Sequence, residues 1–308
     1  MMSVPPSATR PSLAELGHRC QKPDYQRLGT WMARRVSRPL ALRVTWLVLP
    51  WGVSAHAVTL VAWLCALVAA AMFAAGTIDA WLAAAAMFQL WYLLDHVDGQ
   101  LARWHGTASL DGVQLDYLMH HTVNLCVPLA VGYGFTAVLD KPRWLVLGLM
   151  WGLGLLVIGL LNDTRYKAFI ERLKIVEGQL LVFGGGGCRP EEAAPVPRGT
   201  LRAAWWLARK ACEIHVVMNA LTCVALIQWL LDDEVLIGGR ILLACMACLA
   251  PATAIAVLVR SVRRETAERE FAAWYRLPEG AEMVFDAGRW KVCGQAEANC
   301  GPDSSAVG

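Results

Sequence analysis

Three aspartates and one histidine are spaced so that two helices can bring their side chains together. Asp95 and Asp98 lie three residues apart on one helical face, and Asp116 and His120 lie four residues apart on another. Two antiparallel helices joined by a short turn around residues 105–111 would point all four at one spot. Oxygen-rich clusters of this kind suit hard divalent cations such as Mg²⁺ or Mn²⁺. A pair of such cations can hold the attacking and leaving oxygens of a phosphoryl transfer.

Small residues and an arginine accompany the acids. Gly99, Ala102 and Gly112 allow the helix backbones to approach closely and leave room for a bulky anion. Arg103 offers a planar, positively charged fork that suits phosphate. A structural ion pair between Asp98 and Arg103 is the alternative interpretation, but it does not account for the helical spacing of the other positions.

The elements that position these residues are predicted to be membrane helices. The 308 residues are 56% hydrophobic and 17% charged, whereas soluble domains carry about 25% charged residues. This composition argues against a water-soluble enzyme and against disorder over most of the chain. Six apolar runs are candidate spans: 57–76, 80–94, 117–139, 144–162, 214–231 and 241–259. The run at 80–94 is short, so it must carry Asp95 and Asp98 to membrane depth, where ionisable groups are functional candidates.

The basic residues predict the orientation of these spans. Of the 28 Lys and Arg residues, 25 fall in the hydrophilic segments that alternate to one side of the membrane, and 3 fall on the other. The positive-inside rule then places both termini, the 162–210 loop and the Asp95 cluster on the cytoplasmic side. Trp51, Trp81 and Trp229 fall near span ends, where indoles favour the membrane interface.

The sequence therefore predicts an all-α polytopic membrane protein with three parts. Residues 1–53 form a cytoplasmic segment with an amphipathic interfacial helix at 25–49, interrupted by Pro39. Residues 54–260 form a domain of six transmembrane helices into which the cytoplasmic loop 162–210 is inserted. That loop begins as a charged helix and continues as a flexible linker through the four glycines at 184–187. Residues 261–308 form a partly disordered cytoplasmic tail.

The acidic motif resembles the signature of the CDP-alcohol phosphatidyltransferase family, integral membrane enzymes of phospholipid synthesis. That signature reads Asp-x-x-Asp-Gly-x-x-Ala-Arg, eight residues, then Gly-x-x-x-Asp-x-x-x-Asp. The matching positions are Asp95, Asp98, Gly99, Ala102, Arg103, Gly112 and Asp116, and the last family aspartate is replaced by His120. A weaker similarity links residues 54–60 to the family's Thr-Pro-Asn-x-x-Thr-Leu. The resemblance covers roughly residues 34–260.

The resemblance implies a homodimeric membrane enzyme that binds two divalent cations, Mg²⁺ or Mn²⁺. Its metal ligands would be Asp95, Asp98, Asp116 and the residue at position 120, while Gly99, Ala102, Arg103 and Gly112 would line the CDP site. The implied reaction moves a phosphatidyl group from a CDP-linked alcohol, chiefly CDP-diacylglycerol, to a small polar alcohol and releases CMP. The alternatives are a CDP-head-group transferase acting on a lipid alcohol, an inactive scaffold of the same fold, and an ion-binding transporter. Partners would be the CDP-linked substrate and the bilayer, with no nucleic acid.

The two catalytic residues of this scheme would be His120 and Asp116. His120 has three possible roles. An imidazole with an unperturbed pKa of about 6.5 can serve as the general base that takes the acceptor proton. It can also ligate a metal, for which imidazole favours Mn²⁺ or Zn²⁺ over Mg²⁺. The third interpretation is that activity is lost or altered while the fold survives.

Overall fold

The computed structural model describes residues 10–21, 30–182, 199–286 and 288–294. The chain divides into two compact units. The first contains residues 1–157 and 191–254, and the second contains residues 158–190 and 255–308. Two long helices, α6 (Arg143–Lys174) and α9 (Ile237–Arg263), run from the first unit into the second. The linker predicted around residues 184–187 lies outside the described residues.

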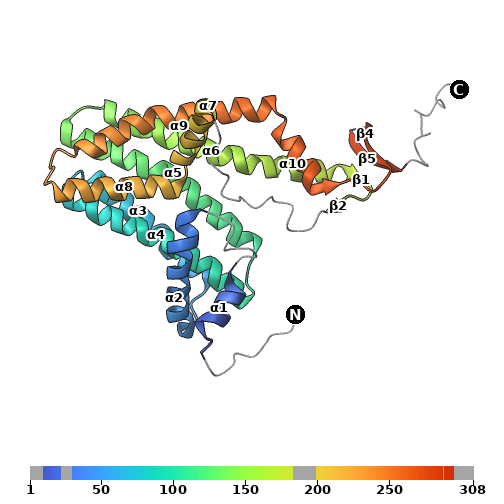
Figure 1. Cartoon of the computed structure of the whole chain (residues 1–308), viewed down its shortest axis with the longest axis horizontal. Coiled ribbons are helices and arrows are strands. Elements are labelled where there is room, and N and C mark those ends of the chain that lie inside the picture. The colour runs from blue at the N-terminus through green and yellow to red at the C-terminus, as the bar shows by residue number, and fades with distance from the viewer. Residues whose placement is uncertain (1–9, 22–29, 183–198, 287, 295–308) are drawn as a thin grey trace. The chain divides into compact units, whose positions relative to one another are not determined.

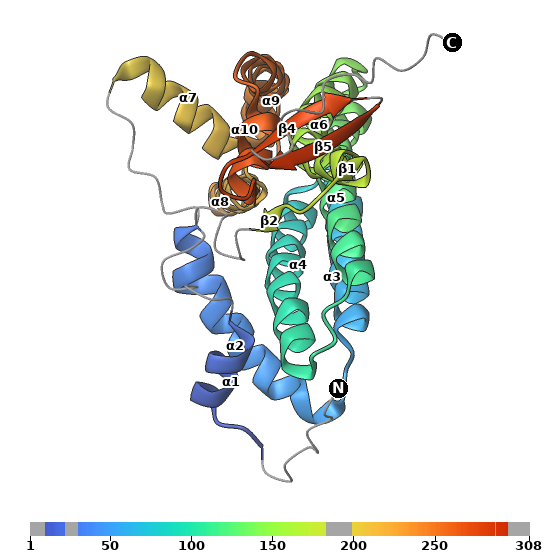
Figure 2. The ribbon, with the colours of Figure 1, turned by 90° about the vertical axis from the view of Figure 1, so that its right-hand side faces the viewer.

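The first unit is a bundle of helices whose centre is the trio α3, α4 and α5, which lie side by side (Figures 1 and 2). Helices α1, α2 and α8 pack against α4, and α7 contacts α8. The unit also contains α6 up to Val157 and α9 up to Ala254. The bounds of its complete helices are α1 (Leu13–Cys20), α2 (Arg38–Val48), α3 (Ala55–Ala74), α4 (Ile78–His105), α5 (Leu110–Leu139), α7 (Thr200–Ala211) and α8 (Ile214–Leu230).

Several of these helices are long and apolar enough to cross a membrane. Within the described residues, α3, α5, α6 and α9 meet that condition. The pair α7 and α8, bent by 76° at a short break, adds a fifth span if it is counted as one. The predicted helical membrane fold is confirmed, and the protein is an integral membrane protein. The count of six spans stays a prediction, because α4 is not among the helices that satisfy the length and composition test.

The sequence predicted that Pro39 interrupts the N-terminal amphipathic helix. In the structure, the helix continues through this residue. A π-helical turn, Ala33–Ser37, leads directly into α2, where Pro39 occupies the first turn. At this junction the Arg38 N–H donates to the Ala33 carbonyl. A proline at the start of a helix has no N–H to satisfy, so the wider turn before it lets the helix continue instead of ending.

This helix turns its small residues inward and its large apolar residues outward. Ala33, Ser37, Ala41 and Thr45 are buried at four-residue steps, and α2 packs against α4. Exposed apolar side chains lie on its other faces, among them Trp31, Leu40 and Leu47. Small residues at the contact allow close packing, while the exposed apolar side suits the interfacial position predicted from the sequence.

Trp81, whose place near a span end suggested an indole facing the membrane interface, faces the inside of the bundle. Its side chain is fully buried in the first unit. The Trp81 ring packs between Phe73 and Phe135, with ring centroids 5.1 and 5.5 Å away. It also fills the space beside Gly239 of α9, where an added Cβ would lie only 2.5 Å from the indole. The ring is an internal spacer between helices, which hydropathy along one helix does not reveal.

The helices α5 and α6 cross at two glycines. A Cβ added to Gly132 would lie 2.5 Å from the Trp144 carbonyl oxygen, and one added to Gly148 would lie 2.6 Å from the Pro128 carbonyl oxygen. Backbone atoms cannot move aside as the end of a flexible side chain can. The absence of both side chains is therefore what permits this close crossing.

We expect Gly148→Leu to force α5 and α6 apart and to destabilise the protein by about 2 kcal/mol, the usual cost of overpacking. The measurement is the thermal unfolding midpoint in detergent. Leu149→Val, one position along at a side chain that is 42% exposed, is the matched control and should leave the midpoint unchanged. An unchanged midpoint in the leucine variant would show that the crossing is not tight.

The second unit joins the first part of the 162–210 loop to the C-terminal tail. Helix α10 (Thr266–Trp274) and the strands β3 (Tyr275–Arg276), β4 (Ala281–Asp286) and β5 (Arg289–Gly294) come from the tail. The loop supplies β1 (Val176–Glu177) and β2 (Leu181–Val182). One sheet has the order β1-β5-β4, with β1 parallel to β5 and β4 antiparallel to it; β2 and β3 form a second, antiparallel pair.

Arg172 connects the loop helix to the tail within this second unit. Its guanidinium makes two hydrogen bonds to the Glu268 carboxylate, one of them 2.6 Å long, and this pairing lowers the pKa of Glu268. The same guanidinium lies 5.1 Å from the Phe271 ring and 5.0 Å from the Trp290 ring. The loop and the tail, which the sequence suggested as separate cytoplasmic segments, therefore pack together as one structure.

Candidate active site

A tight turn between α4 and α5 brings the acidic motif together. Helix α4 ends at Gly106, whose left-handed conformation (φ 65°) suits glycine, and the Thr107 N–H donates to the Ala102 carbonyl over 2.9 Å. Helix α5 begins after Ser109, whose hydroxyl accepts a hydrogen bond of 3.1 Å from the Gly112 N–H. The two helices and the short turn predicted from the spacing are present.

Asp95, Asp116 and His120 form a cluster whose ligand atoms all lie within 4.8 Å of one another. The His120 Nδ1 atom lies 3.2 Å from Asp116 Oδ1, and the Nε2 atom lies 3.7 Å from Asp95 Oδ1. Two carboxylates and one imidazole at this separation are a donor set that can hold a divalent cation. Among the described residues, this is the group of three or more acidic, histidine or cysteine side chains that meets that geometry.

The orientation of His120 is set by its own helix. Its Nδ1 atom lies 3.0 Å from the Asp116 carbonyl oxygen, one turn earlier, and its ring centroid lies 5.5 Å from that of Trp91. A carbonyl oxygen only accepts, so in the neutral imidazole the proton belongs on Nδ1. The lone pair of Nε2 then faces the Asp95 carboxylate, where it can bind a cation or accept a proton.

Asp95 provides an independent indication that the cluster suits a cation. Within the described part of the chain, its Oδ1 atom is buried and has no hydrogen-bond partner. The Asp95 Oδ2 atom lies 3.8 Å from His96 Nδ1. A buried carboxylate oxygen without a donor is costly, and a divalent cation would remove that cost. The residues present therefore fit a metal ion.

Asp98 lies beside this cluster and has a different partner. Its Oδ2 atom lies 2.6 Å from the Thr59 hydroxyl, which also lies 3.1 Å from the Ala55 carbonyl oxygen. The structure therefore brings three of the four predicted metal ligands into one group and places the fourth next to it. The alternative interpretation, an ion pair between Asp98 and Arg103, does not describe their contacts. Asp98 accepts a hydrogen bond from Thr59, and Arg103 Nε donates to the Cys20 carbonyl.

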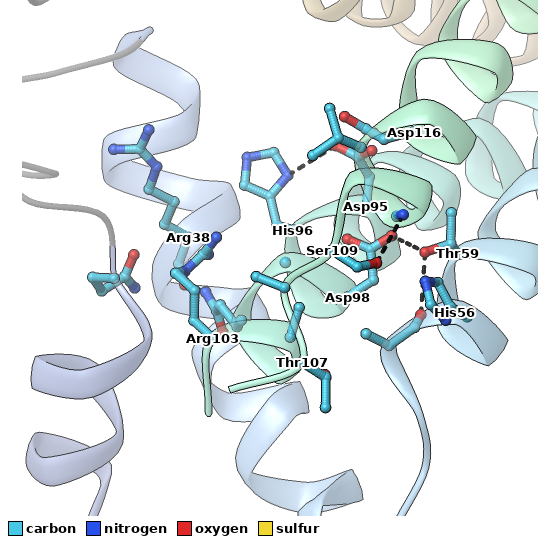
Figure 3. A pocket seen from close by; sticks show the side chains of 18 residues that line it. Arg38, His56, Thr59, Asp95, His96, Asp98, Arg103, Thr107, Ser109 and Asp116 are labelled. Atoms are coloured by element: carbon cyan, nitrogen blue, oxygen red, sulfur yellow. Dashed lines mark hydrogen bonds and ion pairs between the residues drawn. The ribbon is translucent and has the colours of Figure 1, made fainter. Parts of the chain in front are cut away.

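A cavity of about 370 Å³ opens beside the acids. Figure 3 shows the carboxylates of Asp95, Asp98 and Asp116 around one part of this cavity, with Arg38 and Arg103 across from them. The four residues predicted to line the CDP site all line this cavity: Gly99, Ala102, Arg103 and Gly112. His120 is not among the lining residues. The cavity thus combines an anionic wall with a cationic one.

Other lining residues lie outside the acidic motif. Gln21 and Arg38 reach the cavity from the N-terminal segment, and Thr59 and His56 reach it from α3. The similarity of residues 54–60 to the family's entry to the first span was the available signal for the last two. No local pattern marked Gln21 or Arg38, because their places depend on how the N-terminal helices pack.

Arg165, a basic residue near the end of α6, is engaged inside the second unit. Its Nη1 atom lies 2.6 Å from Glu270 Oε1, and its Nη2 atom lies 2.7 Å from Asn162 Oδ1. The contacts tie α6 to α10. Arg165 therefore has a structural role in the second unit.

The comparison with protein families agrees with the motif. Residues 53–176 match the family model for CDP-alcohol phosphatidyltransferase. No curated protein matches the chain. Among solved structures, the Mycobacterium tuberculosis phosphatidylinositol phosphate synthase, crystallised with CDP-DAG bound, is similar at 15% sequence identity and a TM-score of 0.48. That similarity covers 73% of this chain and 92% of the other. The matched segment contains the whole motif from Asp95 to His120, so the similarity to the CDP-alcohol phosphatidyltransferase family covers every candidate site residue.

Proposed function

We propose that the protein transfers a phosphatidyl group from CDP-diacylglycerol to the hydroxyl of a small polar alcohol and releases CMP. One observation carries the proposal. All seven matching motif residues line a single cavity, and two of the acids on its wall, Asp95 and Asp116, belong to a cluster that fits a divalent cation. A lipid donor fits a site built on helices of an integral membrane protein.

The diphosphate of the donor would lie against Arg103 and Arg38. Both residues line the cavity opposite the acids, and guanidinium groups bind phosphate oxygens with paired N–H donors. Gly99, Ala102 and Gly112 leave the space that a nucleotide needs. An imidazole also borders this space, because a Cβ added to Gly112 would lie 3.3 Å from His56 Nε2.

The acids would hold two divalent cations, Mg²⁺ or Mn²⁺. Asp95, Asp98 and Asp116 supply the oxygens, and His120 is available as a further ligand. Bound there, the cations would neutralise charge on the reacting phosphate and orient it. The Nε2 lone pair cannot bind a cation and take a proton at once, and we assign His120 the second role, with Asp116 holding its ring.

In the proposed step, the acceptor oxygen attacks the phosphorus of the phosphatidyl group and the bond from that phosphorus to the CMP oxygen breaks. The hydroxyl proton passes to His120 Nε2. The side chain of His120 is 27% exposed but does not line the cavity. The acceptor would therefore approach from the side of the acids away from the cavity, which fits an in-line displacement with CMP leaving into it.

Gly99 provides a test of the role of Arg103. A Cβ added to Gly99 would lie 3.2 Å from Arg103 Nη1 and 3.4 Å from Nη2, so alanine there must shift the guanidinium by a few tenths of an ångström. Alanine also favours the helix by about 1 kcal/mol relative to glycine. We expect Gly99→Ala to raise or preserve the unfolding midpoint and to weaken CDP binding several-fold, measured by calorimetry with Mn²⁺ present.

The matched background for this test is Arg103→Ala. If Gly99→Ala acts by moving the guanidinium, it should have no further effect on CDP affinity once that group is gone. Additive losses in the double variant would show that alanine at position 99 blocks the ligand directly.

The decisive experiment for the proposed function is mass spectrometry of the lipids of cells that express the protein or its Asp116→Ala variant. We expect a phospholipid that accumulates with the wild-type protein and is lost in the variant, and its head group would identify the acceptor. If the product combines the head group of a CDP-linked donor with a lipid alcohol, the roles of the two substrates are the reverse of those proposed. No change in lipids, with no thermal shift from CDP and Mn²⁺, would favour an inactive scaffold.

Two further features belong to this proposal. We infer a homodimer, which crosslinking in native membranes would test. We also infer that the active site and both termini face the cytoplasm, which proteolysis of sealed vesicles would test. Both inferences rest on the family and on the distribution of basic residues.

A further inference from the structure

Helix α1 (Leu13–Cys20) lies outside the segment that matches the family, yet it is firmly packed on the catalytic domain. Leu16 and Cys20 are fully buried, and α1 packs against α2 and α4. A Cβ added to Gly17 would lie 3.3 Å from the Leu42 side chain of α2. An eight-residue helix is not stable alone in water, so α1 owes its helical form to this packing.

Specific polar contacts fix the position of α1. Arg10 Nη2 donates to the Trp46 carbonyl over 2.5 Å, and its guanidinium lies 3.3 Å from the centroid of the Trp46 ring. The Trp46 indole N–H donates to the Pro11 carbonyl over 2.8 Å. The Arg19 guanidinium lies 4.6 Å from the Trp104 ring, next to the motif arginine. Contacts at both ends of α1 therefore tie it to α2 and α4.

The last residue of α1 binds the motif arginine. Arg103 Nε donates to the backbone carbonyl of Cys20, which is one of the last four carbonyls of the helix and so has no N–H partner within it. That end of the helix also carries partial negative charge, which favours a cation. With Nε held there, the two Nη atoms lie against Gly99 in the cavity wall. Gln21, which follows Cys20, lines the same cavity.

We propose that α1 is a positioning element of the nucleoside-diphosphate site: the Cys20 carbonyl fixes Arg103 through Nε so that both Nη groups meet the diphosphate. This inference rests on the proposed function. When α1 is docked, the Arg103 guanidinium is already ordered before the ligand binds. When α1 is undocked, the ligand itself must order this long, mobile side chain. Docking of α1 and binding of CDP therefore strengthen each other, and by linkage the factor is the same in both directions.

The docked state has a direct reporter in the Cys20 thiol. Cys20 is fully buried against α4, and burial raises its pKa to about 11. Thiols react with maleimides as thiolates, so we expect Cys20 to react slowly in the folded protein. Site-resolved mass spectrometry separates its labelling from that of the other cysteines. A rise in the Cys20 labelling rate measures undocking of α1.

The test compares Leu16→Asp, which places a charge in the buried face of α1, with Leu13→Asp, which changes a side chain that is 42% exposed on the same helix. Neither residue lines the cavity. We expect Leu16→Asp to accelerate Cys20 labelling and to weaken CDP binding about tenfold, within the usual range of coupling between sites. Leu13→Asp should change neither. Binding is measured by calorimetry with CDP and Mn²⁺ on the full-length protein in detergent.

Two more measurements separate positioning from a general loss of structure. In the Arg103→Lys background, which keeps the charge but lacks Nε–H, Leu16→Asp should have no further effect on CDP affinity. In the wild-type protein, saturating CDP should slow Cys20 labelling by the same factor by which undocking weakens CDP binding. A simple loss of folded protein would predict neither result.

The outcomes are distinct. Equal CDP affinity in the wild-type and Leu16→Asp proteins, with Cys20 exposed in the variant, would overturn the role of α1 and leave the proposed function standing. Tighter CDP binding in Leu16→Asp would mean that the Cys20 carbonyl competes with the ligand for Arg103, and would also overturn it. Absence of CDP binding in the wild-type protein would overturn the proposed function and this inference together.

Discussion

Asp95→Asn is expected to lower turnover by at least about a hundredfold while preserving or raising the unfolding midpoint of the metal-free protein. The activity falls because the variant removes a charged oxygen from the cation cluster, and even residues that only support metal ligands commonly cost ten- to a hundredfold. Stability does not fall with it, because the Asp95 Oδ1 atom is buried without a hydrogen-bond partner in the described structure. Removing a buried charge whose oxygen lacks a hydrogen-bond donor relieves a cost, and this offsets the loss of the 3.7 Å pairing with His120 Nε2.

The measurements are CMP release and thermal unfolding with and without Mn²⁺. Wild-type protein should be stabilised by the ion and should lose activity when the ion is chelated, and Asp95→Asn should lose that stabilisation. Asp79→Asn is the matched control, since Asp79 is an exposed acid in the first turn of the same helix, far along it from the cluster. Full turnover in Asp95→Asn would contradict the assignment of the cluster as the metal site.

His120→Ala is expected to abolish turnover, and His120→Asp is expected to retain part of it. The aspartate restores the residue that the family signature has at this position and keeps a group that can accept a proton near Asp116. Loss of a general base typically costs a hundred- to ten-thousandfold. Because a base must be unprotonated, kcat/KM of the wild-type protein should rise with pH along its acid limb. That limb should move to lower pH in His120→Asp, since a carboxylate ordinarily loses its proton at lower pH than an imidazole.

The control is His121→Ala, because residue 121 lies about 100° further around α5 and should not affect turnover. A metal-ligand role for His120 gives a different pattern: the alanine variant would regain activity as the Mn²⁺ concentration is raised, and its pH profile would keep the wild-type shape. Full activity of His120→Ala at low Mn²⁺ would exclude both roles.

The parts of the site that follow from local helix geometry could be predicted from the sequence. The spacing of Asp95 with Asp98, and of Asp116 with His120, is a property of single helices, and the turn between them is marked by Gly106 and by the Ser109 cap. Once those two helices are antiparallel, convergence of the side chains follows. The apolar runs likewise indicated a helical membrane fold, because the bilayer demands one.

The parts that depend on packing between distant segments could not be predicted. Trp81 has the position of an interfacial tryptophan, but Phe73, Phe135 and Gly239 form an internal space that it fills. Asp98 turns to Thr59 of another helix and not into the three-residue cluster. The anchoring of Arg103 on Cys20 joins residues 83 positions apart. None of these contacts can be predicted from periodicity or composition, because each depends on a partner residue elsewhere in the chain.

The pairing of β1 with β5 has a consequence for biosynthesis. Glu177 and Arg289, which form an ion pair across these neighbouring strands, are 112 positions apart in the chain. Helices α8 and α9 are made between them. A chain emerging from the ribosome at about 5–20 residues per second therefore exposes the backbone of Val176 and Glu177 for several seconds before its partner strand exists. The second unit closes only after β5 (Arg289–Gly294) has been made, so a chain truncated before residue 289 would keep that strand edge open to other proteins.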